Sequence, residues 1–432
     1  MRHYVKLLLK IEAHEIRAAF TSFIFVFTLM VAYYTLRPVR DAMASDWSDA
    51  ELSWLWTSTF LISMVVVVIY GSVIARIRFR RIVPGVYGFF SLSFLAFYLG
   101  MHMMDNPVYI DKTFYVWLSV FSLFHVSVFW SFMADTFSKD QGKRLFGFIA
   151  SGASIGAVAG PVFPVFFSAT LGVYNLILLA AALLLLIIPL IAYLEKLKQE
   201  DLRAGQAGAA DSSWITTGGN PLAGFADFFS NRYLLGIGLF ILLYTAMSTF
   251  VYFELKNMLA EFDRATRAQY WGMMDLIVNS LAVVTAMFAT NRLALRFGLS
   301  VTLSIIPVVI VAGWLVVAIS PLLPVLMGLQ VVRRAGNYAV TRPGREMLFT
   351  QVSRETRFRT KPVIDIVVYR GGDMLSGWAY TGLAAGFGLG LAGMGLIGAG
   401  IALMWAIVAV FIGNVYDQDR LHSGPNNPGE PE

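Results

Sequence analysis

Apolar runs of about 20 residues recur along the chain and are separated by short polar connections. A helix of about that length crosses the ~30 Å hydrocarbon core of a bilayer. The pattern therefore predicts an all-α polytopic membrane protein with about twelve transmembrane helices. The predicted spans are residues 18–38, 52–75, 83–103, 113–135, 145–170, 174–194, 233–256, 270–291, 298–320, 322–341, 362–387 and 391–415.

The longest polar segment, residues 195–232, divides these spans into two groups of six. It begins with charged residues and becomes rich in Gly, Ala and Ser, a composition typical of a flexible linker. We therefore expect a six-helix half at 1–194, which starts with an amphipathic segment, and a second six-helix half at 233–416. The polar residues 417–432 are expected to form a disordered tail.

Lys and Arg are concentrated in every second connection between the predicted spans. The positive-inside rule then predicts a multi-pass protein of the bacterial inner membrane, in contact with lipid, with both termini in the cytoplasm. Arg-bearing turns follow the second span of each half, at 75–81 and 291–298. Matched turns of this kind favour the major facilitator architecture, in which two six-helix halves surround a central cavity.

The composition excludes several other classes of function. Hydrophobic residues make up 57% of the chain, and no soluble segment is long enough for a separate catalytic domain, so we do not expect an enzyme. Cysteine is absent and the five histidines are scattered, so the sequence indicates neither a metal site nor a cofactor. The net charge of +6 is explained by topology rather than by nucleic-acid binding. We expect a monomer.

The stretch from Gln330 to Asp373 differs from the apolar spans because it is crowded with charged residues. Arg333 and Arg334 fall in the middle of the span 322–341, where each Arg costs about 2.5–3.5 kcal/mol on insertion scales. Guanidinium groups bind phosphate or carboxylate through paired N–H donors, so the stretch predicts an anion-binding seam. The predicted substrate-binding residues are Arg37, Arg40, Glu254, Lys256, Asp275, Asn279, Arg333, Arg334, Tyr338, Arg345, Asp365 and Arg370.

A second interpretation of the same residues stays open. The intramembrane arginines can instead pair with buried acids, since such pairing is common inside membrane proteins. The available acids are Asp41, Glu254, Asp275, Asp365 and Asp373.

The fifth span contains the run GFIASGASIGAVAGP, in which glycines recur at every fourth or fifth position. Small residues at this spacing let two helices approach closely, and a proline bends the helix that contains it. Close packing is the simpler interpretation. The alternative is a conformational hinge at Gly156, Gly160 and Pro161, whose spacing resembles a signature of major facilitator antiporters.

Four patches resemble the ATP/ADP translocase family of nucleotide exchange transporters. TLRPVRD at Thr35–Asp41 is similar to that family's Ile-Leu-Arg-x-x-Lys-Asp pattern, with Arg40 in place of Lys. YFELK at residues 252–256 and the region 277–298 are similar to two further patches. The closest match is NYAVTRPGREMLFTQV at 337–352, together with the Lys, Ile-Asp and Arg-x-Gly residues that follow it.

The resemblance implies a twelve-helix carrier that exchanges ATP for ADP or moves nucleotides with protons. It places Arg40, Glu254 and Arg345 at or near positions that the family uses for transport. The chain departs from the family pattern at Arg342, Arg345 and Asp373, so another phosphorylated or anionic solute stays open as the substrate.

Together these features predict a secondary transporter of an organic anion that works by alternating access, with a nucleotide as the first candidate. One alternative is a proton-coupled exporter of drugs or metabolites, favoured by the glycine run and the aromatic-rich spans. The other is a membrane protein that handles lipid and carries no solute.

Overall fold

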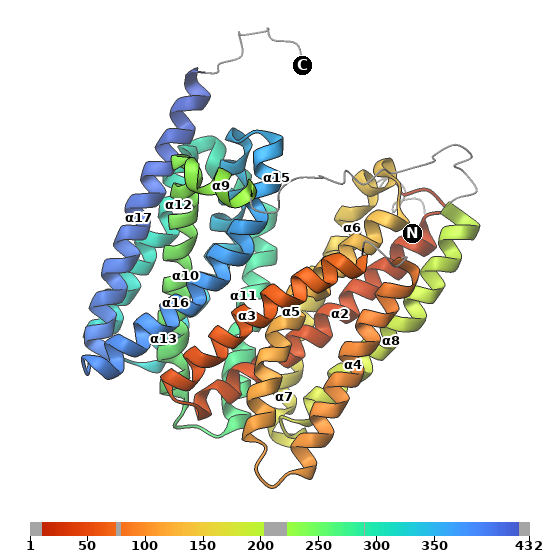
Figure 1. The fold of residues 1–432 in the computed structure, drawn as a ribbon, viewed down its shortest axis with the longest axis horizontal. Helices are drawn as coiled ribbons and strands as arrows, with labels where there is room; N and C mark the ends of the chain where they lie inside the picture. The colour runs from red at the N-terminus through yellow and green to blue at the C-terminus, as the bar shows by residue number, and fades with distance from the viewer. Residues whose placement is uncertain (1–10, 75–78, 203–222, 289, 423–432) are drawn as a thin grey trace. The chain divides into compact units, whose positions relative to one another are not determined.

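The computed structural model describes residues 11–74, 79–202, 223–288 and 290–422, and every regular element within these ranges is a helix (Figure 1). Eight of the described helices are long and apolar enough to cross a membrane, each at a predicted span. The other predicted spans, 52–75, 270–291, 322–341 and 362–387, fall on helical segments as well. The predicted all-α polytopic fold is therefore confirmed.

Some predicted features fall on residues that the structure does not describe. They are the first ten residues of the amphipathic start, the beginning of the turn at 75–81, most of the linker and the last part of the tail. The described ends of the linker are helical: a π-helix, η2 (Lys198–Leu202), precedes the gap, and α9 (Ala223–Ser230) follows it.

The chain divides into two compact units. Unit 1 comprises Met1–Trp47, Leu61–Thr216 and Ala260–Asn279, and unit 2 comprises Ser48–Phe60, Thr217–Leu259 and Ser280–Glu432. Two helices change unit along their length: α3 (Asp49–Ile74) after Phe60 and α11 (Arg264–Phe288) after Asn279. Each unit therefore includes one short segment from the other predicted half of the sequence.

Unit 1 is built around α2, which packs against α5, α6 and α8, while α4 packs against α5 and α8 (Figure 1). Its core is aromatic: Phe25 of α2 contacts Tyr87 of α4 and Phe129 of α5, with ring centroids 5.5 and 4.9 Å apart. The helices of this unit are α2 (Ile16–Met43), η1 (Ala44–Asp46), α4 (Phe79–Met103), α5 (Val108–Thr136), α6 (Lys139–Ala159), α7 (Val162–Leu171) and α8 (Asn175–Leu197), followed by η2.

The glycine run lies on α6, where it faces α2. A Cβ atom would lie 2.7 Å from the Phe23 carbonyl oxygen at Gly152, 2.5 Å from that of Phe27 at Gly156 and 2.6 Å from Tyr34 Cβ at Gly160. The backbones of α2 and α6 are therefore in direct contact, and only glycine fits along this face. Helix α6 ends just before Gly160, and α7 begins just after Pro161. The hinge stays a prediction, because close packing alone explains the glycines.

Gly156→Ala is expected to lower the free energy of unfolding of the purified protein by about 1–3 kcal/mol, because the added methyl group meets the backbone of α2, which cannot move aside. The matched control is Gly147→Ala on the same helix, where a Cβ meets nothing within 4 Å and the better helix former leaves stability unchanged or higher. Unfolding curves in detergent measure both variants. If Gly156→Ala slows transport without loss of stability, the hinge interpretation is favoured over packing.

Unit 2 is built from α10, α12, α13, α16 and α17. Helix α12 packs along α17, and α10 packs against α13, α16 and α17 (Figure 1). The helices are α9, α10 (Arg232–Leu259), α12 (Thr290–Ile319), α13 (Leu323–Gly336), η3 (Asn337–Thr341), α14 (Arg342–Leu348), η4 (Phe349–Gln351), α15 (Arg354–Pro362), η5 (Val363–Val368), α16 (Tyr369–Thr381), η6 (Gly382–Gly386) and α17 (Leu391–His422).

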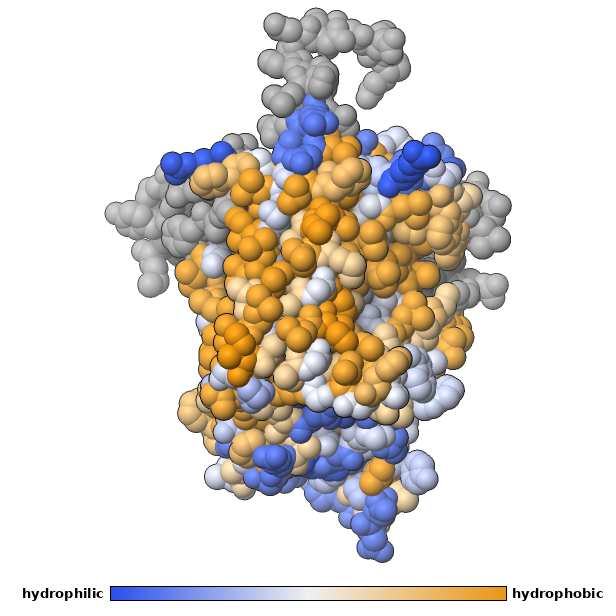
Figure 2. All heavy atoms as spheres, turned by 90° about the vertical axis from the view of Figure 1, so that its left-hand side faces the viewer, coloured by the Kyte–Doolittle hydropathy of each residue, from blue (hydrophilic) through white to orange (hydrophobic). Residues whose placement is uncertain are grey.

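The outer face of unit 2 carries a broad hydrophobic band with hydrophilic residues above and below it (Figure 2). Exposed side chains on α12 and α17 form much of the band, among them Val308, Val316, Leu403, Ile407 and Phe411. Large apolar side chains that are more than a third exposed over such an area indicate contact with lipid rather than water. The protein is thus a multi-pass membrane protein.

Helix α17 extends beyond the predicted start of the tail at residue 417 and continues to His422. The reason is Asp417, whose carboxylate accepts hydrogen bonds from the backbone N–H groups of Leu299 and Ser300, both at 3.0 Å. Those N–H groups are available because Gly298 interrupts α12 with a left-handed φ of 77°. A charged residue read as part of a tail therefore fixes the end of this helix.

Candidate functional site

In unit 1 the predicted arginines are paired with acids. Arg40 forms an ion pair with Asp41 at 2.6 Å and lies over the Tyr115 ring, 5.2 Å from its centroid. Arg37 lies 3.8 Å from Asp41 and 3.6 Å from Asp275. The interpretation in which intramembrane arginines meet buried acids therefore holds for α2.

Asn279 lies one turn beyond Asp275 on α11, as predicted, but its amide has a structural partner. Its Nδ2 donates a 2.7 Å hydrogen bond to the backbone carbonyl of Ala157 on α6, and the side chain is buried. That bond satisfies a carbonyl in the glycine-rich segment of α6, where α11 approaches closely. The structure thus gives Asn279 a role in holding two helices of unit 1 together.

Arg333 of α13 stands in contrast to the arginines of unit 1. Its side chain is buried, with only 3% of the residue exposed. The guanidinium donates to Gln330 Oε1 at 2.6 and 3.2 Å and to the Tyr244 hydroxyl at 3.4 Å, and it lies 5.8 Å from the Tyr244 ring centroid. Among the residues that the structure describes, no carboxylate forms an ion pair with it.

Other predicted residues lie on the same or neighbouring elements of unit 2. Arg334 follows Arg333 on α13 and is also buried, and Tyr338 lies in the π-helix η3 that continues α13. Arg370 and Asp373 lie on α16, and Asp373 interacts electrostatically with both Arg370 and Arg333. Because π-helical turns widen a helix locally and often mark functional sites, η3 places this cluster at an irregular point of the fold.

The charged residues between α13 and α16 form a second network, separate from Arg333. Glu346 of α14 accepts hydrogen bonds from Lys361 Nζ at 2.6 Å and from Arg345 Nη2 at 3.1 Å. Arg345 also lies 3.6 Å from Asp365, whose side chain is 41% exposed. Arg345 and Asp365, both predicted to bind substrate, thus belong to one network of ion pairs that also includes Glu346 and Lys361.

The pKa of Glu346 is held below its usual value of 4.5: burial alone would raise it, but the hydrogen bonds from Lys361 and Arg345 outweigh burial. A carboxyl whose pKa is lowered on folding stabilises the fold above its unfolded pKa and loses that contribution as the pH falls through the folded value. Below about pH 4.5 the network should therefore weaken, by about 1 kcal/mol or less because the groups are part-exposed. Melting temperatures from pH 7 to 4 measure this effect. The melting temperature of Glu346→Gln should fall less at the acid end of this range than that of the unchanged protein.

A third cluster in unit 2 contains Glu254 and Lys256 of α10. Lys256 is only 1% exposed, and its Nζ lies 2.7 Å from Asp49 Oδ1 at the start of α3. Asn257 donates to the same Asp49 oxygen at 3.1 Å. Glu254 is buried and hydrogen-bonded to the hydroxyl of Tyr380 on α16. Lys256, predicted to contact substrate, forms an ion pair with Asp49 in this conformation.

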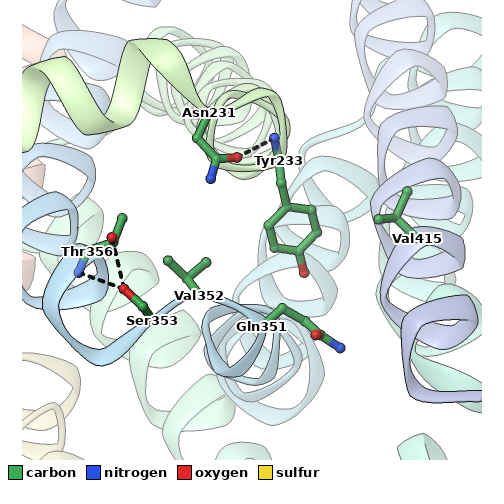
Figure 3. Close-up of a pocket in the computed structure, with 7 residues that line it drawn as sticks. All are labelled: Asn231, Tyr233, Gln351, Val352, Ser353, Thr356 and Val415. Carbon is green, nitrogen blue, oxygen red and sulfur yellow. Dashed lines mark hydrogen bonds between the residues drawn. The ribbon is translucent and has the colours of Figure 1, made fainter. Parts of the chain in front are cut away.

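A cavity of about 380 Å³ opens between the start of α10, the turn before α15 and the end of α17 (Figure 3). Its lining is uncharged: Asn231, Tyr233, Gln351, Val352, Ser353, Thr356 and Val415. Asn231 Oδ1 and Ser353 Oγ already accept hydrogen bonds from the backbone N–H groups of Tyr233 and Thr356, in the first turns of α10 and α15. None of the predicted substrate-binding residues lines this cavity.

Sequence reasoning missed the neutral partners of the arginines and one ionic cluster in unit 1. Gln330 lies one turn before Arg333 and was readable from its spacing, whereas Tyr244 comes from a helix far away in sequence. The cluster centres on Arg264, which lies 2.6 Å from Asp46 and 2.8 Å from Asp111 and also hydrogen-bonds Tyr174. Asp46, Asp111 and Arg264 lie between the predicted spans, and Tyr174 is the first residue of one, so nothing in the sequence connected them.

The comparisons with known proteins agree on one fold. The family model described as Major Facilitator Superfamily matches residues 19–353. No curated protein matches the sequence.

Among solved structures, the chain is similar to a bacterial homologue of the human lysosomal transporter Spinster in an inward-facing, unoccupied conformation. The TM-score is 0.62 at 11% identity, over 97% of this chain and 100% of that one. It is also similar to the nucleoside transporter NupG, with a TM-score of 0.61 at 13% identity over 93% and 99% of the two chains. For the POT family transporter PepTSo the TM-score is 0.62 at 11% identity, over 94% of this chain and 99% of that one.

Proposed function

Because the chain belongs to the Major Facilitator Superfamily, we propose that it is a secondary transporter of an organic anion that works by alternating access. A nucleotide, exchanged in the manner of ATP for ADP, is the first candidate, and another phosphorylated metabolite is the second. The transporter fold rests on the family match and on the similar solved structures. The proposed substrate class rests on Arg333 and the residues around it.

The observation that carries the proposal is the state of Arg333. A guanidinium that is 3% exposed, and whose hydrogen-bond partners among the described residues are Gln330 and Tyr244, is a buried charge without a carboxylate at ion-pair distance. Asp373 lowers the cost of this charge by its electrostatic interaction with Arg333 but forms no ion pair with it within the described part of the chain. Burying a charge that is only partly compensated is costly, and such residues inside membrane proteins are typical of substrate pathways. An anionic substrate supplies a closer counter-charge through the paired N–H donors of the guanidinium.

The surroundings of Arg333 support a phosphorylated ligand with an aromatic part. Arg334 and Arg370 add positive charge on α13 and α16, and three arginines suit a group with more than one negative charge. The rings of Tyr244 and Tyr369 lie 6.1 Å apart next to the guanidinium. Aromatic faces of this kind stack with flat heterocycles, as nucleotide bases do.

The remaining parts of the proposal come from topology and from the pairing in unit 1. We place the protein in the bacterial inner membrane as a monomer with both termini in the cytoplasm, as the distribution of Lys and Arg indicates. The two six-helix halves at 1–194 and 233–416 then alternate around the substrate. Arg37 and Arg40, held by Asp41 and Asp275, contribute to substrate binding only if their ion pairs open.

A ligand screen with purified protein tests the substrate class. ATP and ADP are expected to raise the melting temperature, because a ligand that binds only the folded state stabilises it by about 2.7 kcal/mol at 100 times its dissociation constant. Adenosine at equal concentration is the matched control and should have a much smaller effect, because it lacks the phosphates that Arg333 binds. Stabilisation by uncharged or cationic compounds, with none by anions, would favour a proton-coupled exporter instead.

A further inference from the structure

Glu254 is a buried acid that the sequence predicts to bind substrate, but the anion-binding site proposed around Arg333 does not include it. It lies near the end of α10, 5% exposed, and it forms no ion pair among the described residues. Its Oε1 atom is buried and has no hydrogen-bond partner. The hydroxyl of Tyr380 hydrogen-bonds the carboxyl group. The Tyr380 ring contacts the rings of Phe250 and Phe253, with centroids 5.3 and 4.8 Å apart.

The charges around Glu254 do not balance when both nearby carboxyl groups are ionised. Among the residues that the structure describes here, Lys256 is the cation of this cluster, and it forms a 2.7 Å ion pair with Asp49, to which Asn257 also donates a hydrogen bond. Glu51, on the same first turn of α3 as Asp49, adds further negative charge near Lys256. An ionised Glu254 would therefore give the buried cluster an excess negative charge, whereas a protonated Glu254 makes the group of Asp49, Glu254 and Lys256 neutral.

We propose that Glu254 is a proton-binding site of the transporter, and that it takes up and releases a proton as the protein moves its substrate. This inference rests on the proposed function, since it names the ion coupled to transport. In the present conformation the carboxyl oxygen without a partner is buried close to aromatic side chains, where a charged group costs more than a neutral one. Release needs a conformation in which water reaches Glu254.

The cluster joins three helices. Glu254 and Lys256 lie on α10, while Asp49 comes from α3 and Tyr380 from α16. Any movement of the first turn of α3 relative to α10 changes the distance between Asp49 and Lys256, and with it the net charge that Glu254 experiences. The proton on Glu254 and the ion pair of Asp49 are thus linked to the same helix contact, so protonation and conformation depend on each other.

Proteoliposomes with Glu254→Gln test the proposal, since glutamine resembles the protonated acid in shape. The variant is expected to keep anion exchange between equal pools within twofold of the unchanged protein, because exchange needs no net proton movement. Uptake driven by an imposed pH gradient should be at least tenfold lower in this variant than in the unchanged protein. Glu261→Gln, at an exposed acid in the connection after α10, is the matched control and should keep both activities.

Infrared spectroscopy of the purified protein gives a second readout that needs no substrate. The carbonyl stretch of a protonated carboxylic acid should be present near neutral pH and absent from Glu254→Gln. If Glu254→Gln responds to the pH gradient like the unchanged protein, or if the unchanged protein exchanges anions but shows no uptake driven by the pH gradient, the proton site is wrong while the proposed function stands. If no anion is exchanged at all, the proposed function fails, and the infrared band still decides whether Glu254 holds a proton.

Discussion

Arg333→Gln is expected to lower uptake of the anionic substrate by about 10-fold to 100-fold. A hydrogen bond to a charged group contributes about 1.5–3 kcal/mol, and each 1.4 kcal/mol is a factor of ten in binding. The same variant should be as stable as the unchanged protein or more stable, because it removes a buried charge that forms no ion pair with a carboxylate in the described ranges. Opposite effects on transport and stability are the signature of a residue kept for function.

Uptake by proteoliposomes and melting temperature should be measured on the same preparation. Arg232→Gln, an exposed arginine at the start of α10 in the same unit, is the control and should change neither quantity. Arg333→Lys keeps the charge but lacks the paired donors, so its uptake should lie between that of Arg333→Gln and that of the unchanged protein. A large loss of stability in Arg333→Gln with transport intact would mean that Arg333 is a structural residue.

The largest loss of stability is expected for Arg264→Gln in unit 1. Arg264 joins Asp46 of η1 to Asp111 of α5, and Asp111 is completely buried. Removing one partner of a buried ion pair costs about 3–5 kcal/mol, because the other charge stays buried without compensation. We take about 3 kcal/mol here, since Arg264 itself is 29% exposed.

Denaturation in detergent measures this loss, with Lys143→Gln as the control. Lys143 pairs with Asp140 at 3.2 Å, but both side chains are more than three-quarters exposed, so less than about 1 kcal/mol is expected. The double variant Arg264→Gln with Asp111→Asn should recover part of the stability, because it leaves no unpaired charge. No recovery in the double variant would show that the ion pair is not the source of the loss.

The fold could be predicted from the sequence because its main signal is local. Twenty apolar residues in a row determine a transmembrane helix without reference to the rest of the chain, and helices occur at every predicted span. Boundaries that depend on distant contacts could not be predicted. Helix α17 runs to His422 because Asp417 binds the backbone after Gly298, and a one-dimensional pattern carries no sign of that pairing.

The candidate site was predictable in part for the same reason. The unusual placement of Arg333 within an apolar span is visible in the sequence, and the structure shows that it is buried. Which arginines meet acids is not visible, because Arg37 meets Asp275 across more than two hundred positions. Lys256 was expected at the substrate, yet it pairs with Asp49, a residue that looked like the polar start of a span.

Exchange across a membrane shows whether the protein transports anions. Liposomes containing the purified protein should be loaded with ADP and supplied with labelled ATP outside, with Arg333→Gln and protein-free liposomes in parallel. We expect label uptake that needs ADP, or another phosphorylated anion that the protein accepts, inside the liposomes. This uptake should fall by about tenfold or more in Arg333→Gln. Uptake no greater than in protein-free liposomes for ATP and every phosphorylated solute tried, across a range of pH, would contradict the claim that this protein is an anion transporter.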